Sequence, residues 1–346
     1  MPPPAAPLSL LVLHNRDYQR QDPSSPGFAS SADDEHAAAD VATALRSRGH
    51  RVAVESIDSD GVPALLGRVG ELGVELVFNL CESLDGDNRN EVVVPALLDL
   101  GGVAYTGSGP RALGLALQKD RTKEVLRARG VPTPEAVLVS DADPEQVARR
   151  FPLPFPLIVK PTREDGSVGI DRGSVVRDRA GLLRALERVV RGLGQPALCE
   201  RFIEGREFYV SLLGNDPPVA MPFHEIDFSA MPAGLPRIVS YAGKWDPSSP
   251  EWGGTRATRC HLDEPIRARA EAAAVAAFGA LGLRDYARVD LRLGADGVPL
   301  VIDVNPNCDL GASSGFPRAA GYAGIEYPDL LERICRLALA RPRPPL

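Results

Sequence analysis

The order of apolar runs in the first third of the chain narrows the choice of fold more than any other pattern. Short apolar runs that predict strands occur at residues 8–13, 51–57 and 74–80. Residues 33–48 are predicted to form a helix that ends at Gly49, and residues 90–101 a second helix that ends at Gly101. Alternation of strands and helices implies a parallel sheet that binds ligands at the carboxyl ends of its strands.

The remaining two thirds follow a different order. A helical segment over 111–130 ends at the break "VPTPE", and strands at 155–161 and 196–203 flank a helix around 182–190. Residues 216–259 show no clear period. A helix over 265–281 and two strands around the turn at 295–297 come after them, and these strands lie at 286–293 and 298–305.

Composition limits the classes of function. The 346 residues are 44% hydrophobic, which is enough for a sizeable core, and the net charge of −7 with no basic stripe disfavours a nucleic-acid partner. The five cysteines are widely spaced and favour neither disulfides nor a zinc site. With no signal peptide or membrane span evident, we expect a cytoplasmic protein with a small-molecule partner and no membrane partner.

Oxygen donors gather on the last predicted hairpin. Asp303 and Asn305 in "VIDVNPN" are two positions apart, so they share one face of a strand, and the turn can bring Asp290 of "ARVDLRL" beside them. Hard divalent cations such as Mg²⁺ prefer oxygen ligands. A polar strand end that faces solvent would give the same pattern.

Two further stretches suit a nucleotide. In "VKPTREDGSVGI", Lys160 ends an apolar strand and a glycine-containing loop comes next, although there is no Walker motif. In "LCERFIEGREFYV", Glu200 and Glu207 could accept hydrogen bonds from an adenine amino group and ribose hydroxyls. An ordinary surface hairpin and two exposed acids remain the alternatives.

The order of these stretches resembles a known family. "YTGSG", "VKPTREDGSVG", "CERFIEGREF", "ARVDLRL" and "DVNPN" occur in the order found in the ATP-grasp superfamily, and within it the chain resembles the D-alanine–D-alanine ligases over residues 10–339. The resemblance implies an α/β (α+β) fold of three domains. These are an N-terminal parallel α/β domain (1–110), a central ATP-grasp subdomain (111–213) and a C-terminal α+β catalytic domain (214–346).

The resemblance also implies roles for individual residues. It assigns Lys119 and Lys160 to ATP phosphates, Glu200 and Ile203 to adenine, Glu207 to ribose, Asp290, Asp303 and Asn305 to Mg²⁺ or to Mn²⁺ in its place, Arg288 to the tetrahedral intermediate, and Ser314 to the second substrate's carboxylate. Asp303 stands where these ligases usually have Glu.

Departures from the family pattern lie in the part that binds amino acids. Trp245 follows the lid lysine, Lys244, where the ligases have Tyr, and Gly166 replaces the loop serine with Ser167 beside it. We take Lys244 and Ser167 as catalytic candidates. Glu35 is the candidate for the acid that holds the first substrate's amine, Glu82 replaces a histidine and Asp309 replaces a glycine. We therefore expect a conserved ATP site and an altered amino-acid site.

The resemblance implies a ligase in which a carboxylate attacks the γ-phosphate of ATP and an amine then attacks the acyl phosphate. The substrates would be amino acids or small peptides, and the expected assembly is a homodimer. A protein that binds ATP without ligation, as a regulator or scaffold, is the alternative. A Rossmann dehydrogenase is disfavoured because no G-x-G-x-x-G follows the first strand.

Overall fold

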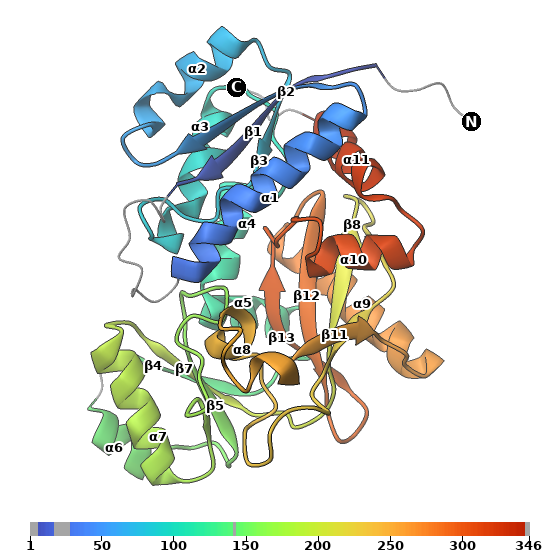
Figure 1. Ribbon diagram of the computed structural model, residues 1–346. Coiled ribbons are helices and arrows are strands. Elements are labelled where there is room, and N and C mark those ends of the chain that lie inside the picture. Colours follow the sequence, from blue (N-terminus) through green and yellow to red (C-terminus); the bar gives the residue numbers. More distant parts are fainter. Residues whose placement is uncertain (1–5, 17–27, 141–142, 343–346) are drawn as a thin grey trace.

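The computed structural model describes residues 6–16, 28–140 and 143–342, and these residues form three sheets (Figure 1). The N-terminal sheet is parallel, has the order β2-β1-β3, and consists of β1 (Ser9–Asn15), β2 (Arg51–Ile57) and β3 (Leu76–Asn79). The three predicted strands and their parallel arrangement are confirmed.

Helices cover both faces of this sheet because successive side chains of β1 alternate between the faces. Leu10 and Val12 pack with α1 (Phe28–Ser47) and α11 (Tyr327–Ala340). Leu11 and Leu13 pack with α2 (Leu65–Leu72) and α3 (Val93–Leu100). The first predicted helix is confirmed and ends as expected near Gly49, whose φ of 85° lies in the left-handed region.

Residues 111–130, expected as one helical segment, form two helices instead, α4 (Pro110–Leu117) and α5 (Lys119–Ala128). Gln118 between them has a ψ of 87°, outside the helical range. The Lys119 backbone N–H donates to the Thr162 carbonyl at 3.2 Å, which ties the start of α5 to the central sheet. The break therefore places Lys119 beside the glycine-containing loop.

The central sheet is antiparallel and has the order β4-β7-β5-β6. Its strands are β4 (Ala136–Val139), β5 (Leu157–Pro161), β6 (Val175–Val176) and β7 (Ala197–Arg201). One face packs against α6 (Pro144–Arg149) and α7 (Arg179–Leu186), which continues into a π-helical turn, Glu187–Gly192. The other face is open toward the third sheet.

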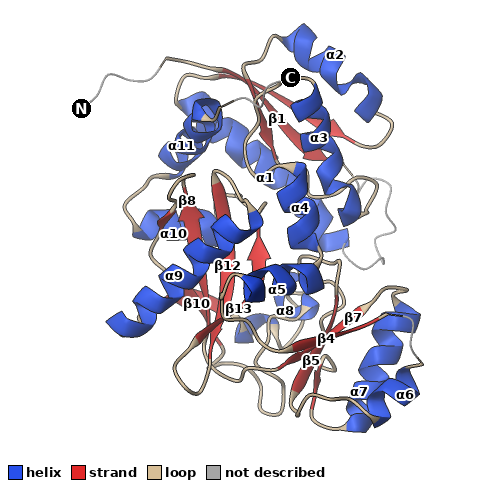
Figure 2. Cartoon of the chain, turned by 180° about the vertical axis from the view of Figure 1, so that it is seen from behind, coloured by secondary structure: helices blue, strands red, loops and turns tan. Residues whose placement is uncertain are grey.

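The C-terminal sheet is antiparallel, with the order β11-β10-β8-β12-β13 and a short β9 paired with β8. Its strands are β8 (Glu207–Leu213), β9 (Val219–Ala220), β10 (His224–Asp227), β11 (Arg256–Arg259), β12 (Tyr286–Leu293) and β13 (Pro299–Asn305). The helix α9 (Glu264–Leu281) packs across its back (Figure 2) and ends at Gly282, with φ of 67°. Two short helices, α8 (Tyr241–Trp245) and α10 (Gly315–Tyr322), lie on the other side.

The expectation that residues 216–259 are irregular is wrong in part. This segment contributes three strands, β9, β10 and β11, and the helix α8. β10 pairs with β8 and with β11 over four residues or fewer. Strands this short show no reliable period in a sequence, because their pairing depends on neighbours distant in the chain.

Among the residues described, no helix has the length and apolar character needed to cross a membrane. All five cysteines are free thiols in this structure.

Candidate active site

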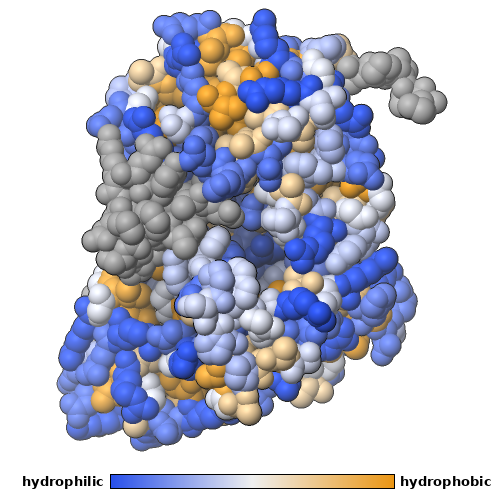
Figure 3. Space-filling view, in the orientation of Figure 1, coloured by the Kyte–Doolittle hydropathy of each residue, from blue (hydrophilic) through white to orange (hydrophobic). Residues whose placement is uncertain are grey.

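A cavity of about 1140 Å³ lies where the three sheets meet, and Figure 3 shows the molecule hollowed near the centre of this face, among hydrophilic residues. Every candidate residue named from the sequence lines this cavity except Glu35. Glu35 is exposed, whereas its neighbours His36 and Ala37 reach the cavity wall. The sequence therefore identified residues from all three sheets that converge on one space.

The three oxygen donors of the last hairpin are neighbours. Asp290 on β12 lies opposite Asp303 on β13, and the Asn305 amide donates to Asp290 Oδ2 at 3.3 Å. Among the described residues, no group of three or more His, Cys, Asp or Glu side chains is placed to hold a metal ion. The candidate set is thus two carboxylates and one amide, a small set of the kind that Mg²⁺ takes when water and phosphates complete its shell.

The charges around this set support a cation there. Burial raises the pKa of Asp290, Arg288 opposes the shift, and the neighbouring Asp303 carboxylate raises the pKa further. Asp290 is buried and Asp303 is partly buried, and a divalent cation shared between two carboxylates would offset their repulsion. The residues present therefore fit Mg²⁺.

Lys119 connects the hairpin to the glycine-containing loop. Its Nζ lies 3.2 Å from Asp165 of the loop and 3.3 Å from Asp303. Burial lowers the pKa of Lys119, but Asp303 and Asp165 outweigh it and the net shift is upward. Lys160 Nζ donates to the Ile302 carbonyl at 3.2 Å. Two cationic amines thus lie beside the oxygen donors, as phosphate binding requires.

The candidate adenine and ribose residues are held by ion pairs. Glu200 pairs with Lys123 and lies 3.6 Å from Lys160. Arg292 binds Glu207 at 2.6 Å and the Ile203 carbonyl at 2.6 Å. Arg292 is not among the residues predicted from the sequence, although it is two residues after Asp290 on a strand and therefore shares its face.

The lid residues contact the glycine-containing loop directly. The Trp245 indole N–H donates to the Gly166 carbonyl at 2.9 Å, and the Ser167 hydroxyl donates to the Val239 carbonyl at 2.9 Å. Gly166 and Ser167 both have left-handed backbones, with φ of 59° and 65°. Lys244, on α8, is exposed to the cavity, where desolvation and then the Arg288 charge lower its pKa.

Two of the candidate substrate residues, Asp309 and Ser314, lie in the segment between β13 and α10. Asp309 Oδ1 accepts from the Gly311 backbone N–H at 2.7 Å, so this carboxylate is turned into its own loop. The Ser314 hydroxyl donates to the Asp309 carbonyl at 2.7 Å. Asp309 and Glu82 both raise the pKa of Lys244, against the downward effects of desolvation and Arg288.

Comparison with protein families decides the classification. The family model described as "D-ala D-ala ligase C-terminus" matches residues 125–336, which is more than half of the chain. The chain belongs to the D-alanine–D-alanine ligase family. It is thus an ATP-grasp protein of the D-alanine–D-alanine ligase-like, ATP-dependent ligase type.

Individual relatives of this D-alanine–D-alanine ligase family member include named ligases. A D-alanine–D-alanine ligase of Synechococcus sp. (strain JA-2-3B'a(2-13)) is 34% identical over 300 residues, which cover 86% of this chain and 86% of the relative. An uncharacterized protein, y4sG, of Sinorhizobium fredii is also 34% identical, over 77% of this chain and 75% of its own. The crystal structure of D-alanine–D-alanine ligase from Bacillus anthracis complexed with ATP has a TM-score of 0.74 at 23% identity, covering 97% and 98% of the two chains. This structural similarity shows that the two proteins share a fold.

Some cavity residues of this family member were not selected from the sequence. Glu91 is buried, and its Oε1 accepts from the Asn307 amide at 3.1 Å. Burial, and then Asp165, raise the pKa of Glu91 to about 8. Asn307 also donates to the Cys81 carbonyl at 3.0 Å, which joins the loop after Asn305 to the N-terminal sheet. No period or motif around Glu91 marks it as buried, because its partners are distant in the chain.

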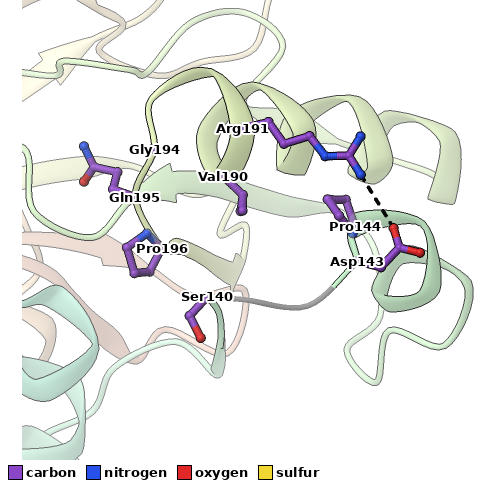
Figure 4. Close-up of a pocket in the computed structure, with 8 residues that line it drawn as sticks. All are labelled: Ser140, Asp143, Pro144, Val190, Arg191, Gly194, Gln195 and Pro196. Atoms are coloured by element: carbon purple, nitrogen blue, oxygen red, sulfur yellow. Dashed lines mark ion pairs between the residues drawn. The ribbon is translucent and has the colours of Figure 1, made fainter.

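A second cavity, of about 430 Å³, lies between the segment before α6 and the π-helical turn (Figure 4). Arg191 and Asp143 form an ion pair of 3.8 Å at its edge. None of the candidate residues lines it. In this family member, the candidate residues line the larger cavity instead.

Proposed function

We propose that this protein is an ATP-dependent carboxylate–amine ligase that joins amino acids through an acyl phosphate. One observation carries the proposal. Lys119 and Lys160 lie in the same cavity as Arg288 and the donors Asp290, Asp303 and Asn305. Phosphoryl transfer and amine addition both develop negative charge, and preorganised cations stabilise it.

The reaction has two steps. A carboxylate oxygen of the first amino acid attacks the γ-phosphorus of ATP, the bond to the bridging oxygen breaks, and ADP leaves. The amine of the second amino acid then attacks the acyl carbon, and phosphate leaves with the carboxylate oxygen. We assign Lys119 and Lys160 to the phosphates in the first step, Arg288 to the oxyanion in the second, and Lys244 and Ser167 to the lid that encloses both.

Mg²⁺ would be held by Asp290, Asp303 and Asn305, where it would supply positive charge to phosphate oxygens, and Mn²⁺ shares its preference for oxygen ligands. Glu200, Ile203 and Glu207 form the assigned adenine and ribose end. Arg292 and Lys123 fix the two carboxylates there in position.

The amino acids are proposed to differ from two D-alanines. Relatives are named D-alanine–D-alanine ligase. Here Trp245, Gly166, Glu82 and Asp309 replace the residue types that this family uses around its amino acids, and Glu35 lies outside the cavity wall. The proposed substrates are therefore other amino acids or small peptides.

Phosphate release from ATP and Mg²⁺, measured against single and paired amino acids of both configurations, tests the proposal. We expect release with at least one pair, together with a product of the combined mass less water. An ATP-binding protein that releases no phosphate with any pair would contradict ligation and favour a regulator or scaffold.

Asp303→Ala tests the assignment of the cation site. We expect turnover to fall at least 10²-fold, because removing one such contact typically costs about 3–4 kcal/mol of transition-state stabilisation. Asp296→Ala, at the turn of the same hairpin, is the matched control and should remain active. Full activity of Asp303→Ala with an unchanged circular dichroism spectrum would refute the assignment.

A further inference from the structure

A row of cross-strand neighbours runs from the oxygen donors to the far edge of the C-terminal sheet. Asp303 lies opposite Asp290, Asp290 opposite Tyr209, and Tyr209 opposite His224. Residues directly opposite one another share a face of the sheet. Two strand spacings separate His224 from Asp290, or about 10 Å. His224 thus lies on the same face as the donors, in the cavity wall but well away from them.

The His224 side chain is fixed in place yet lacks a hydrogen-bond partner for one nitrogen. It is 2% exposed, and its ring meets the Tyr209 ring edge-on at 5.0 Å. Its Nε2 lies 2.8 Å from where a Cβ would stand on Gly315, so only glycine leaves room for the ring. Its buried Nδ1 has no hydrogen-bond partner in the described part of the chain. Such a group is costly to leave unpaired, and a ligand would satisfy it.

The charges that act on His224 are both positive. Burial, and then the guanidinium groups of Arg288 and Arg318, lower the pKa of His224 to about 3, so the imidazole is neutral near pH 7. A neutral imidazole can donate one N–H without a charge of its own. This part of the cavity wall therefore combines a donor with a positive field.

Arg318 supplies the unbalanced charge. It lies on α10 and in the cavity wall, and it donates to the carbonyls of Ala257 at 3.3 Å and Ser313 at 2.9 Å. Within the described ranges, no carboxylate lies within 4.0 Å of it. Carbonyl partners hold the guanidinium in place but leave its full charge, and three of its five N–H groups have no partner there.

The other cations at this end have acids beside them. Arg288 is bound by Asp290 through two hydrogen bonds of 2.7 and 2.9 Å. Asp309 and Glu82 both raise the pKa of Lys244, against the downward effects of desolvation and Arg288. Arg318 thus remains a cation without an ion-pair partner among the described residues, and the neutral His224 adds a hydrogen-bond donor to the same part of the cavity wall.

We propose that Arg318 and His224 form a second anion subsite in the acceptor half, so that the amine-bearing substrate is an acidic amino acid. This inference rests on the proposed ligase function. The α-carboxylate of the acceptor is assigned to the region of Ser314, and its side-chain carboxylate binds Arg318 and the His224 N–H. A guanidinium binds a carboxylate with better geometry than any other side chain does.

The test compares matched acceptors. Aspartate against asparagine and glutamate against glutamine, in both configurations, are offered with ATP, Mg²⁺ and each first amino acid, and kcat/KM is taken from phosphate release. We expect the wild type to prefer the acid over its amide by at least roughly tenfold, since a hydrogen bond to a charged group is worth roughly tenfold to a hundredfold in selectivity.

Variants assign that preference to the subsite. Arg318→Gln should bring the ratio of acid to amide close to one, and Arg318→Lys should restore part of it. A variant that is merely less well folded would lose both acceptors equally, so the ratio separates recognition from structure. Arg256→Gln is the matched control, because Arg256 lines the same cavity but lies 3.6 Å from Asp227. Equal use of acid and amide by the wild type, or an unchanged ratio in Arg318→Gln, would overturn the inference.

A binding measurement keeps the inference testable if ligation itself fails. Isothermal titration of aspartate and asparagine into the protein with Mg²⁺ and a non-hydrolysable ATP analogue requires no turnover. Binding of aspartate that is lost in Arg318→Gln supports the subsite even when no pair of amino acids releases phosphate. Absence of any binding by aspartate, or equal binding of aspartate by the wild type and Arg318→Gln, overturns it.

Discussion

Glu91 is a carboxyl group enclosed by the N-terminal sheet and the loop after β13. Burial, and then Asp165, raise its pKa to about 8, above the ordinary value of 4.5. Between these two values the unfolded chain has lost a proton that the folded chain keeps. The folded state is therefore destabilised progressively as the pH rises through this window.

Glu91→Gln should remove this pH dependence, because glutamine can still accept from the Asn307 amide and cannot ionise. We expect the free energy of unfolding of Glu91→Gln, relative to the wild type, to rise by on the order of a few kcal/mol from pH 5 to pH 8. Urea unfolding at the two pH values measures it. If the difference in unfolding free energy between Glu91→Gln and the wild type were the same at pH 5 and pH 8, the assigned pKa would be contradicted.

The sequence revealed those site residues whose partners are nearby along the chain, and it did not reveal those whose partners are distant. Asp303 and Asn305 share a face because of strand periodicity alone, and a hairpin turn brought Asp290 to them. Glu91 and His224 depend on contacts with loops and helices more than 80 residues away, such as Asn307 and Gly315. No local pattern contains that information, so the structure was needed to find them.

The segment that carries α8 closes over the glycine-containing loop through several contacts. Trp245 binds the Gly166 carbonyl, Ser167 binds the Val239 carbonyl, and the Tyr241 backbone N–H donates to the Ile170 carbonyl at 2.9 Å. Arg172 adds an ion pair of 3.0 Å to Glu251. The two elements thus form one wall of the candidate phosphate site.

Trp245→Phe keeps the ring but removes the N–H that reaches Gly166. We expect the KM for ATP to rise roughly two- to tenfold, because a neutral hydrogen bond contributes about 0.5–1.5 kcal/mol. Trp252→Phe is the matched control, since Trp252 lines the same cavity but is 45% exposed, and it should leave this KM unchanged. Equal effects of the two variants would show that the contact with Gly166 has no special role.

Long elements with a clear hydrophobic period were predicted with nearly correct bounds. The short strands β10 and β11 were not predicted. The strands β12 and β13 and the helix α9 agree closely with the predicted residues because each is long and has turn residues at its ends. The strands β10 and β11 have four residues each, and they form by pairing, β10 with β8 and β11 with β10. A sequence gives no independent sign of such pairing.

The N-terminal and C-terminal parts are joined behind the cavity by a buried ionic cluster. Asp285, immediately before β12, is fully buried and has φ of 63°. Its Oδ2 accepts from the Gly107 backbone N–H at 2.8 Å and lies 3.1 Å from Arg341, and its Oδ1 accepts from the Asn215 amide at 3.2 Å. The loop that leads to Lys119 and the strand that carries Arg288 are thereby held together.

Arg341→Met should lower the free energy of unfolding by about 3–5 kcal/mol, because it leaves the Asp285 carboxylate buried without its cation. Asp285→Asn in the same protein should recover part of this loss, since no charge is then left unpaired. Urea unfolding of the two single variants and the double variant gives the interaction energy. Strict additivity would show that the pair does not couple the two parts.

The three predicted parts of the molecule each contribute strands to a sheet, although the boundaries at 110 and 213 remain a prediction. β8 ends at the second boundary, yet it pairs with β10 and β12 beyond it. The sequence indicated strands and their order along the chain. It could not indicate which sheet a strand between two parts would join, because that choice depends on the packing of both.

The central claim is that this cavity activates a carboxylate by transferring phosphate to it. An amino acid labelled with ¹⁸O in its carboxylate, incubated with the enzyme, ATP, Mg²⁺ and an acceptor, tests this most directly, because the released phosphate can be analysed by mass spectrometry. The mechanism predicts one ¹⁸O atom in each phosphate formed. Unlabelled phosphate would mean that water, and not a carboxylate, attacks ATP, and the ligase mechanism would be contradicted.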